Sequence, residues 1–158
     1  TRSVSAYHRP VTDDARRPET SPLPDHLRLF LADPHFATIA TLDPDGAPRQ
    51  AVVWYTLDGD GLIINSAIGR RWPANLLRDP RVAISIADRH DGYRWVGMNG
   101  VVTVIRDQAT AQADIAAMAR RYHADEPEEA ERLITSRFQT QERISFRVVI
   151  GAVHDHLD

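Results

Sequence analysis

The sequence predicts a small closed antiparallel β-barrel with a few short flanking helices, which is a mainly β (α+β) fold. Three observations support this prediction: six apolar runs of strand length, tight turns between several of them, and only short segments with helical spacing. A chain of 158 residues, 42% of them hydrophobic, is long enough for one domain with its own core. We expect this domain over residues 23–158. Residues 1–22 contain three prolines and little apolar periodicity, so we expect a mobile N-terminal arm there.

The first part of the domain is expected to hold one helix and three strands. Apolar residues recur at helical spacing from Leu23 to Leu31, and Pro34 ends this helix. Tight turns that contain Asp-Gly pairs join three strand segments, and this arrangement predicts an antiparallel meander. The three strand segments, which are rich in residues that suit a pleated surface, are residues 36–42, 48–57 and 62–65.

A short helix and a buried strand are expected next. The spacing becomes helical after Gly69, and Asp79-Pro80 closes the helix because a residue before proline disfavours the α conformation. Residues 82–87 form a continuous apolar run, which predicts a strand buried on both faces.

The last part of the chain predicts a long strand, two helices and a final strand. The long strand spans residues 93–105, where Gly97 and Gly100 indicate bends or bulges. Two amphipathic helices follow, one on either side of Pro127. The alternation over residues 144–150 predicts a half-buried strand.

The composition excludes several kinds of chemistry. The chain has no cysteine, which excludes disulfides, thiolate catalysis, iron–sulfur clusters and cysteine zinc sites. All 19 basic residues are arginine, which excludes Schiff-base chemistry and a P-loop lysine, and leaves arginine, histidine and backbone N–H groups to hold any anion. The net charge of -3 argues against a nucleic-acid partner. Without a long apolar segment or a secretory signal, we expect a cytoplasmic protein with no membrane partner.

Catalytic and metal-binding motifs are absent from the sequence. It contains no G-x-G-x-x-G, Walker, G-x-S-x-G or H-E-x-x-H pattern, so no catalytic residue is assigned. His154 and His156 could share one face of a terminal strand, but a metal site needs a third ligand. We therefore interpret them as part of a solvated tail and expect no metal.

An anion-binding segment is predicted where the third strand passes into the following helix. Small polar residues end the strand at Asn65 and Ser66, glycine breaks it, and Arg70 and Arg71 open the helix. Free N–H groups and the positive dipole end of a helix attract phosphate, and arginine can add bidentate hydrogen bonds. The alternative interpretation is a solvated basic turn beside acidic neighbours.

Two further segments give the sequence a resemblance to a known family. These are Ala40-Thr-Leu-Asp-Pro-Asp-Gly-Ala-Pro48 and Asn75-Leu-Leu-Arg-Asp-Pro-Arg-Val82, which occur in order with Val53-Trp-Tyr55 and Arg70 between them. Together they resemble the pyridoxamine 5'-phosphate oxidase-like split-barrel family, most closely its actinobacterial branch that uses the deazaflavin coenzyme F420. The similarity runs from about Leu23 to Val153. It implies a six-stranded antiparallel split barrel, a homodimer, and flavin-type cofactors in grooves between the subunits.

The resemblance also implies which residues hold the cofactor. The tricyclic ring is expected on the second and third strands and the phosphate at the start of the following helix. Tyr93 and Trp95 are expected on the substrate side or in contact with the partner subunit. The residues expected to bind the cofactor are Arg49, Val52, Val53, Trp54, Asn65, Ser66, Ala67, Arg70, Arg71, Trp72 and Asn75.

Trp72 departs from the family pattern, because many relatives place a lysine at the matching position. An indole cannot replace an ammonium as a phosphate clamp. Either Arg71 takes over the charge, or phosphate is held less tightly and Trp72 packs against the ring, the substrate or the core.

The resemblance implies an F420-dependent oxidoreductase that transfers hydride to a conjugated small molecule at a groove in the dimer interface. Two alternatives remain open from the sequence. One is an FMN-dependent oxidase or reductase of the same fold. The other is a non-catalytic carrier or sensor that binds a flavin or pigment.

Overall fold

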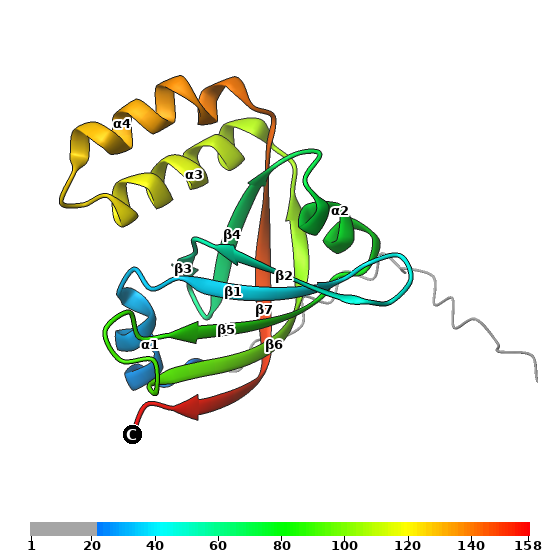
Figure 1. The fold of residues 1–158 in the computed structure, drawn as a ribbon, viewed down its shortest axis with the longest axis vertical. Helices are drawn as coiled ribbons and strands as arrows, with labels where there is room; N and C mark the ends of the chain where they lie inside the picture. The colour runs from blue at the N-terminus through cyan, green and yellow to red at the C-terminus, as the bar shows by residue number, and fades with distance from the viewer. Residues whose placement is uncertain (1–21) are drawn as a thin grey trace, which may run out of the picture.

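The computed structural model describes residues 22–158, and the expected N-terminal arm lies almost wholly outside them. One antiparallel sheet curls around a core, with helices at its ends and on one side (Figure 1). The helices are α1 (Asp25–Ala32), α2 (Arg71–Arg78), α3 (Gln108–Tyr122) and α4 (Pro127–Ser136), followed by a 3-10 turn, η1 (Phe138–Thr140). The strands are β1 (Ala37–Leu42), β2 (Pro48–Val53), β3 (Thr56–Asp58), β4 (Gly61–Ala67), β5 (Arg81–Ala87), β6 (Trp95–Ile105) and β7 (Arg143–His156).

The expected fold class is confirmed, but the sheet has seven strands, in the order β2-β1-β5-β6-β7-β4-β3. The seventh strand arises because the predicted strand over residues 48–57 breaks at Trp54 and Tyr55. Its two parts, β2 and β3, lie at the opposite edges of the sheet. The expected meander is therefore two separate hairpins, β1–β2 and β3–β4, rather than one continuous run.

Tyr55 explains the break. Its side chain is fully buried, and its hydroxyl lies 3.1 Å from the carbonyl oxygen of Leu31 and 3.0 Å from that of Asp33. Arg121 of α3 donates from Nη1 to the carbonyl oxygen of Tyr55 at 2.6 Å. These contacts come from distant parts of the chain and take the place of strand pairing at this point.

Two apolar clusters stabilise the fold. The larger lies inside the curled sheet, where α1 contributes Leu27 and Leu31 and α2 contributes Leu76. The smaller lies between β4 and the α3–α4 hairpin, the segment from Gln108 to Thr140. Its buried residues are Ile63, Ile115, Met118, Ala119, Ala130, Ile134 and Phe138. None of the helices within residues 22–158 is long and apolar enough to cross a lipid bilayer.

The α3–α4 hairpin also changes the environment of β7. Ser145 is completely buried because α3 covers the face of β7 that points away from the barrel interior. The final strand, expected to be half-buried, is therefore covered on both faces over its first half.

The sequence predicted that β5 is buried on both faces, but the structure buries only one face of this strand. Its residues alternate, with Val82, Ile84 and Ile86 buried and Ala83 and Ser85 exposed. The exposed residues are small and uncharged, which is why a continuous apolar run could not distinguish this pattern from a fully buried strand.

The strand β6 begins at Trp95, so Tyr93 lies in the preceding loop and not on the strand. The expected irregularity is confirmed by a register shift between Met98 and Gly100. A Cβ atom on Gly100 would lie 2.5 Å from the carbonyl oxygen of Val149, so this glycine allows β6 and β7 to approach closely.

Candidate functional site

A cavity of about 200 Å³ lies between the end of β2, the start of α2 and the α3–α4 hairpin. We call it the anion cavity because several positively charged arginines, described below, line it. Six of its lining residues belong to the set expected from the sequence: Val52, Val53, Trp54, Asn65, Arg70 and Trp72. Five more come from the hairpin and β7 and were not expected: Ile115, Met118, Arg137, Phe138 and Arg143.

Arg143 forms the buried part of this cavity, with only 3% of its surface exposed. Its Nε and Nη2 atoms donate to Oδ1 of Asn65 at 3.0 and 2.7 Å, and its Nη1 donates to Oε1 of Gln141 at 2.6 Å. The guanidinium carbon lies 5.1 Å from the centre of the Phe138 ring. Amide oxygens and an aromatic face therefore hold this cation, without a carboxylate in contact among the described residues.

Asn65 connects Arg143 to the rest of the network. Its Nδ2 donates to the carbonyl oxygen of Ala111 at 2.9 Å and to Oγ of Ser145 at 2.8 Å. Ser145 donates in turn to Oδ2 of Asp114 at 2.6 Å. This carboxylate reaches the guanidinium only through two neutral side chains, so its charge is not in direct contact with that of Arg143.

Gln108, at the start of α3, fixes the backbone of Arg143. Its Oε1 accepts from the Arg143 backbone N–H at 2.9 Å, and its Nε2 donates to the Arg143 carbonyl oxygen at 2.6 Å. Both the backbone and the side chain of Arg143 are thus held in place before any ligand binds.

Two more arginines gather at the cavity with Arg143. Arg70 at the N-cap of α2 and Arg137 at the C-cap of α4 are exposed, and neither forms an ion pair with a described residue. Burial, together with the positive charges of Arg70 and Arg137, lowers the pKa of Arg143 to about 10. The guanidinium still carries its charge at neutral pH, so three cations converge on one cavity.

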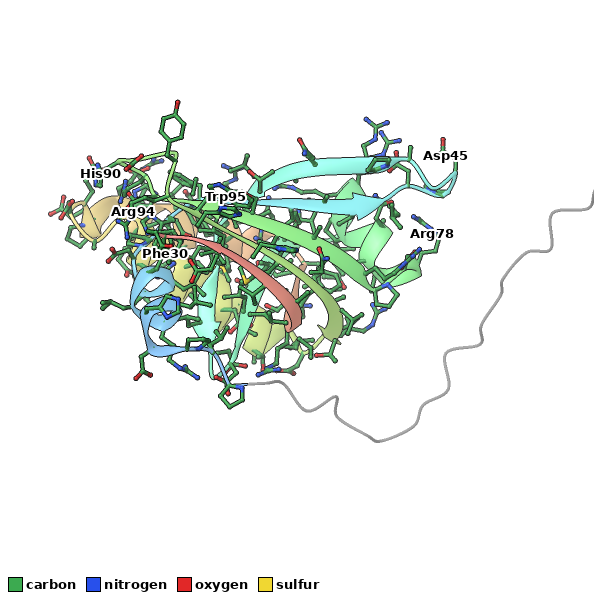
Figure 2. All side chains as sticks on the ribbon, turned by 90° about the horizontal axis from the view of Figure 1, so that it is seen from below. Phe30, Asp45, Arg78, His90, Arg94 and Trp95 are labelled. Atoms are coloured by element: carbon green, nitrogen blue, oxygen red, sulfur yellow. The ribbon has the colours of Figure 1, made fainter. Side chains whose placement is uncertain are left out.

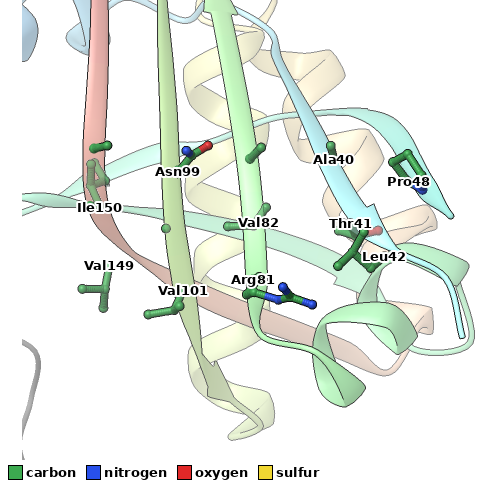
Figure 3. Close-up of a pocket in the computed structure, with 14 residues that line it drawn as sticks. Ala40, Thr41, Leu42, Pro48, Arg81, Val82, Asn99, Val101, Val149 and Ile150 are labelled. Atoms are coloured by element: carbon green, nitrogen blue, oxygen red, sulfur yellow. The ribbon is translucent and has the colours of Figure 1, made fainter. Parts of the chain in front are cut away.

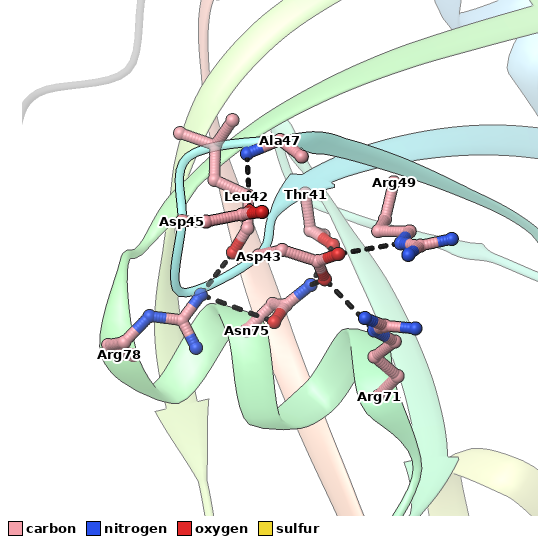
Figure 4. Close-up of polar contacts among 9 residues, drawn as sticks. All are labelled: Thr41, Leu42, Asp43, Asp45, Ala47, Arg49, Arg71, Asn75 and Arg78. Atoms are coloured by element: carbon pink, nitrogen blue, oxygen red, sulfur yellow. Dashed lines mark hydrogen bonds and ion pairs between the residues drawn. The ribbon is translucent and has the colours of Figure 1, made fainter.

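The other expected basic residues lie around Asp43 instead (Figure 4). Arg49 Nε donates to Oδ2 of Asp43 at 2.6 Å, and Arg71 Nε donates to its Oδ1 at 3.0 Å. Asn75 Nδ2 donates to the same Oδ1 at 3.0 Å. These contacts lower the pKa of Asp43 to about 2, and the hydrogen bond from Arg49 has the largest effect. Arg49, Arg71 and Asn75 therefore fasten the β1–β2 turn to α2.

Aromatic side chains form the walls of the anion cavity. The ring of Trp54 stacks on Tyr122 with centroids 5.0 Å apart and meets Phe138 edge-on at 6.2 Å. Trp72 packs against Phe146 of the core at 5.7 Å and also lines the cavity. Each tryptophan thus combines packing with a surface that a bound ligand would touch.

The remaining expected residues lie elsewhere. Ser66 and Ala67 are buried in β4, and Oγ of Ser66 has no hydrogen-bond partner among the described residues. Tyr93 is 92% exposed, and Trp95 stacks on His156 at 4.2 Å. Figure 2 shows the loop that leads into Trp95, with His90 and Arg94, at the opposite end of the molecule from the β1–β2 turn.

The side of the sheet that faces away from the core carries a second, larger hollow of about 730 Å³ (Figure 3). We define the outer face by the residues that pair across β1, β5 and β6 on this side. It has small, uncharged side chains at its centre. These residues are Thr38, Ala40, Ala83, Ser85, Gly97 and Asn99.

Sequence reasoning missed Arg137 and Arg143. Arg137 lies in the second predicted amphipathic helix, and Arg143 lies one residue before the alternating run of residues 144–150, so each has the same pattern as any solvated side chain. The one available signal was the absence of lysine, which requires arginine to supply every strong cation. It does not say which arginines meet, since the α3–α4 hairpin must first fold against β4.

The chain is similar in sequence to a known family and to a relative within it. Residues 23–151 match the family described as pyridoxamine 5'-phosphate oxidase. A protein of Mycobacterium tuberculosis (strain CDC 1551 / Oshkosh) described as an F420H(2)-dependent biliverdin reductase is 28% identical over 109 residues, covering 68% of this chain and 78% of that protein.

Solved structures agree in fold. One described as an F420 reductase has a TM-score of 0.66 at 24% sequence identity, covering 84% of this chain and 98% of that one. Another, described as HutZ, the heme storage protein from Vibrio cholerae, has a TM-score of 0.61 at 17% identity, covering 85% of this chain and 95% of that one. The split-barrel fold is therefore shared by proteins described with different ligands.

Proposed function

Since the chain belongs to the pyridoxamine 5'-phosphate oxidase family, we propose that it is an oxidoreductase that uses the deazaflavin coenzyme F420. The proposed substrate is a conjugated small molecule. The relative described as an F420H(2)-dependent biliverdin reductase supports F420 over FMN. The observation that carries the proposal is the buried, carboxylate-free guanidinium of Arg143 beneath a cavity with aromatic walls.

The residues of the anion cavity fit such a cofactor. A flavin-type molecule combines a flat aromatic ring system with a phosphorylated tail. Arg70, Arg137 and Arg143 offer the positive charge that the tail needs, and Trp54 and Trp72 offer flat apolar surfaces. At about 200 Å³ the cavity has room for the anionic end of the molecule rather than for the whole of it. The ring would then lie at the mouth of the cavity, beside Trp54 and Trp72 and along β2, where Val52 is 69% exposed.

The chain's own residues would bind and position rather than react. When bound, reduced F420 supplies a hydride to an electron-poor double bond, so the protein needs no nucleophile of its own. The arginines would hold the tail, and the tryptophans would exclude water from one side of the ring. Because Asn65, Gln108 and Gln141 fix Arg143, the anchor is rigid, as transfer at contact distance requires.

A second copy of the chain would complete the groove. The outer face is uncharged at its centre and exposes the sheet around β5, as expected of a surface that a partner covers. Trp95 lies on the same side of the sheet, because its register partner Ala87 follows Ser85 in alternation. In this proposal the protein is a homodimer, and Trp95 lies where the two copies meet.

A direct test adds F420 and, separately, FMN to the purified protein and follows quenching of tryptophan fluorescence. We expect saturable quenching with F420 and weak or no quenching with FMN. Reduced F420 is then supplied with enones, quinones and tetrapyrroles, and its oxidation is followed by absorbance. Tight FMN binding without F420 binding would show that the cofactor is FMN and not F420. Binding without turnover across the panel would instead indicate a carrier or sensor.

A further inference from the structure

His35 is a buried histidine outside the anion cavity, and the proposed function gives it no role. It lies between α1 and β1, and only 2% of its surface is exposed. Its ring stacks on Phe30 of α1 with centroids 4.4 Å apart. Its backbone carbonyl oxygen accepts from the hydroxyl of Tyr122 of α3 at 2.5 Å, and burial raises the pKa of this tyrosine, so its hydroxyl keeps the proton. Two helices therefore fix both the ring and the backbone of His35.

The hydrogen bond made by the imidazole ring defines its protonation state. The backbone N–H of Arg89 donates to Nδ1 of His35 at 3.2 Å. A backbone N–H can only donate, so Nδ1 carries a lone pair and the single ring proton lies on Nε2. This Nε2 is buried and has no hydrogen-bond partner among the described residues. The contact with Arg89 thus requires a neutral ring, and it leaves one buried donor unsatisfied.

Arg89 belongs to the β5–β6 loop, residues 88–94, which is exposed over most of its length (Figure 2). The loop is closed by its own contacts, such as the hydrogen bond from the Asp88 backbone N–H to the Arg94 carbonyl oxygen at 2.8 Å. Within residues 22–158, two hydrogen bonds join it to segments distant in sequence. One is the bond to His35, and the other runs from Nε of Arg94 to the carbonyl oxygen of Leu157 at 3.2 Å. Loss of the first would free the side of the loop that carries Arg89.

We propose that His35 is a pH-sensitive switch that holds the β5–β6 loop when its ring is neutral and releases the loop when the ring is protonated. Protonation places a hydrogen on Nδ1, so this atom and the Arg89 N–H become two donors that face each other. Repulsion then replaces the hydrogen bond. Release lets water reach the ring and supplies a partner to the Nε2 donor, which the closed state leaves unsatisfied.

The surroundings of the ring set the direction of the switch. Burial has the largest effect and lowers the pKa of His35 below its usual value of 6.5. Asp88 of the loop and Asp33 after α1 act in the opposite direction, whereas Arg89 of the loop and Arg121 of α3 act with burial. In the released state the ring is hydrated and regains its usual pKa. A proton therefore binds the released state more tightly than the closed state, so release becomes more frequent as the pH falls below 6.5.

Release of the loop extends to the end of the sheet at Trp95. This residue begins β6 directly after the loop, and its ring stacks on His156 at 4.2 Å. Tyr93, which is 92% exposed, moves with the loop. The switch needs neither a cofactor nor a second copy of the chain, so it goes beyond the proposed function and its test is independent of that function.

The test measures hydrogen exchange of the Arg89 amide in the full chain at pH 7.5, 6.5 and 5.5, corrected for the chemical exchange rate of a free peptide at each pH. The corrected rate reports the opening equilibrium of the loop. A released-state pKa near 6.5 predicts that this equilibrium rises about fivefold to tenfold from pH 7.5 to 5.5. The amide of Ile84, in a strand paired on both sides, should be protected far more strongly at every pH, which would show that Arg89 opens locally.

Two variants assign the pH response. His35→Asn keeps an acceptor for the Arg89 N–H but does not titrate, so the exchange of this amide should become independent of pH. The matched control is His90→Asn, the same change at an exposed histidine of the loop, which should keep the wild-type response. If His35→Asn does not fold, the wild-type spectrum decides. The imidazole ¹⁵N resonances of His35 and the Arg89 amide should then titrate with one midpoint below pH 6.5, and different midpoints would overturn the switch.

Three further results would overturn the switch. One is exchange of the Arg89 amide that does not change with pH in the wild type. Another is a pH response that His35→Asn retains or that His90→Asn loses. The third is equal protection of the Arg89 and Ile84 amides, which would show that the loop opens only when the whole domain unfolds.

Discussion

Arg71 Nε lies 3.0 Å from Oδ1 of Asp43, although 28 residues separate the two in sequence. The same carboxylate also accepts from Arg49 and Asn75, and only 4% of its side chain is exposed. Arg71 therefore directs its charge toward the β1–β2 turn and away from the anion cavity. In the proposed site, the charge that a lysine supplies in many relatives would therefore come from Arg137 and Arg143, which line the anion cavity with Arg70.

The first prediction separates Arg70 from its neighbour Arg71. Arg70→Ala should weaken F420 binding by about 1.5–3 kcal/mol, the usual value of a charge-assisted hydrogen bond. Arg71→Ala should leave the affinity nearly unchanged and lower the melting temperature, because it releases a contact of Asp43. Fluorescence titration and thermal melting measure the two effects. Equal losses of affinity in both variants would place the anchor at the start of α2, as the sequence predicted.

The sequence predicts those parts of the fold that depend on local patterns. The helices and most strands follow from apolar spacing and turn residues within a few positions, and they are observed. The break at Trp54 and Tyr55 could not be predicted in this way. It depends on carbonyl groups of Leu31 and Asp33 and on Arg121, which are neighbours of Tyr55 only in the folded chain.

The candidate site shows the same limit. Trp54, Asn65 and Arg70 come from segments that the sequence singled out, and they meet at one cavity. The role proposed for Arg143 depends on its burial under α3, and the role proposed for Arg137 depends on where α4 ends. A sequence pattern does not contain the packing of a helical hairpin on a strand that is 40 or more residues away.

The second prediction concerns pH and His35. Burial lowers the pKa of this histidine below its usual value of 6.5, and its Nε2 has no hydrogen-bond partner among the described residues. The unfolded chain takes up a proton near pH 6.5, whereas the folded chain resists it until a lower pH. The stability that neutral His35 provides is therefore present above pH 6.5 and is lost as the pH falls below it.

His35→Asn should flatten this dependence. The asparagine oxygen can replace Nδ1 as the acceptor for the Arg89 backbone N–H and does not titrate. Loss of the ring stacked on Phe30 at 4.4 Å should cost about 0.5–1.5 kcal/mol at pH 7.5. Urea unfolding between pH 7.5 and 5 measures both effects. Parallel stability curves for the variant and the wild type would contradict the role of His35.

The third prediction tests the close approach of β6 and β7. Gly100→Ala should destabilise the fold by about 1–3 kcal/mol, because the new Cβ would lie 2.5 Å from a backbone oxygen that cannot move alone. Gly92→Ala is the matched control, since a Cβ there would have no atom within 4 Å. It should change the stability by less than about 0.5 kcal/mol. Chemical unfolding of both variants makes the comparison, and similar stabilities would show that the strands have room to separate.

The last prediction concerns the outer face. If two copies pair there, light scattering of the wild type should give about twice the chain mass of 17.8 kDa. Ala83→Glu places a charge at the centre of this face, between Ala40 and Asn99 on the neighbouring strands, and should give a monomer. Ala117→Glu makes the same change at an exposed position on α3 and should leave the mass unchanged. Since the proposed groove needs both copies, Ala83→Glu should also weaken F420 binding while retaining the circular dichroism spectrum of the wild type. A wild-type monomer, or a dimer that survives Ala83→Glu, would move the pairing away from this sheet and leave its exposed small residues without a partner.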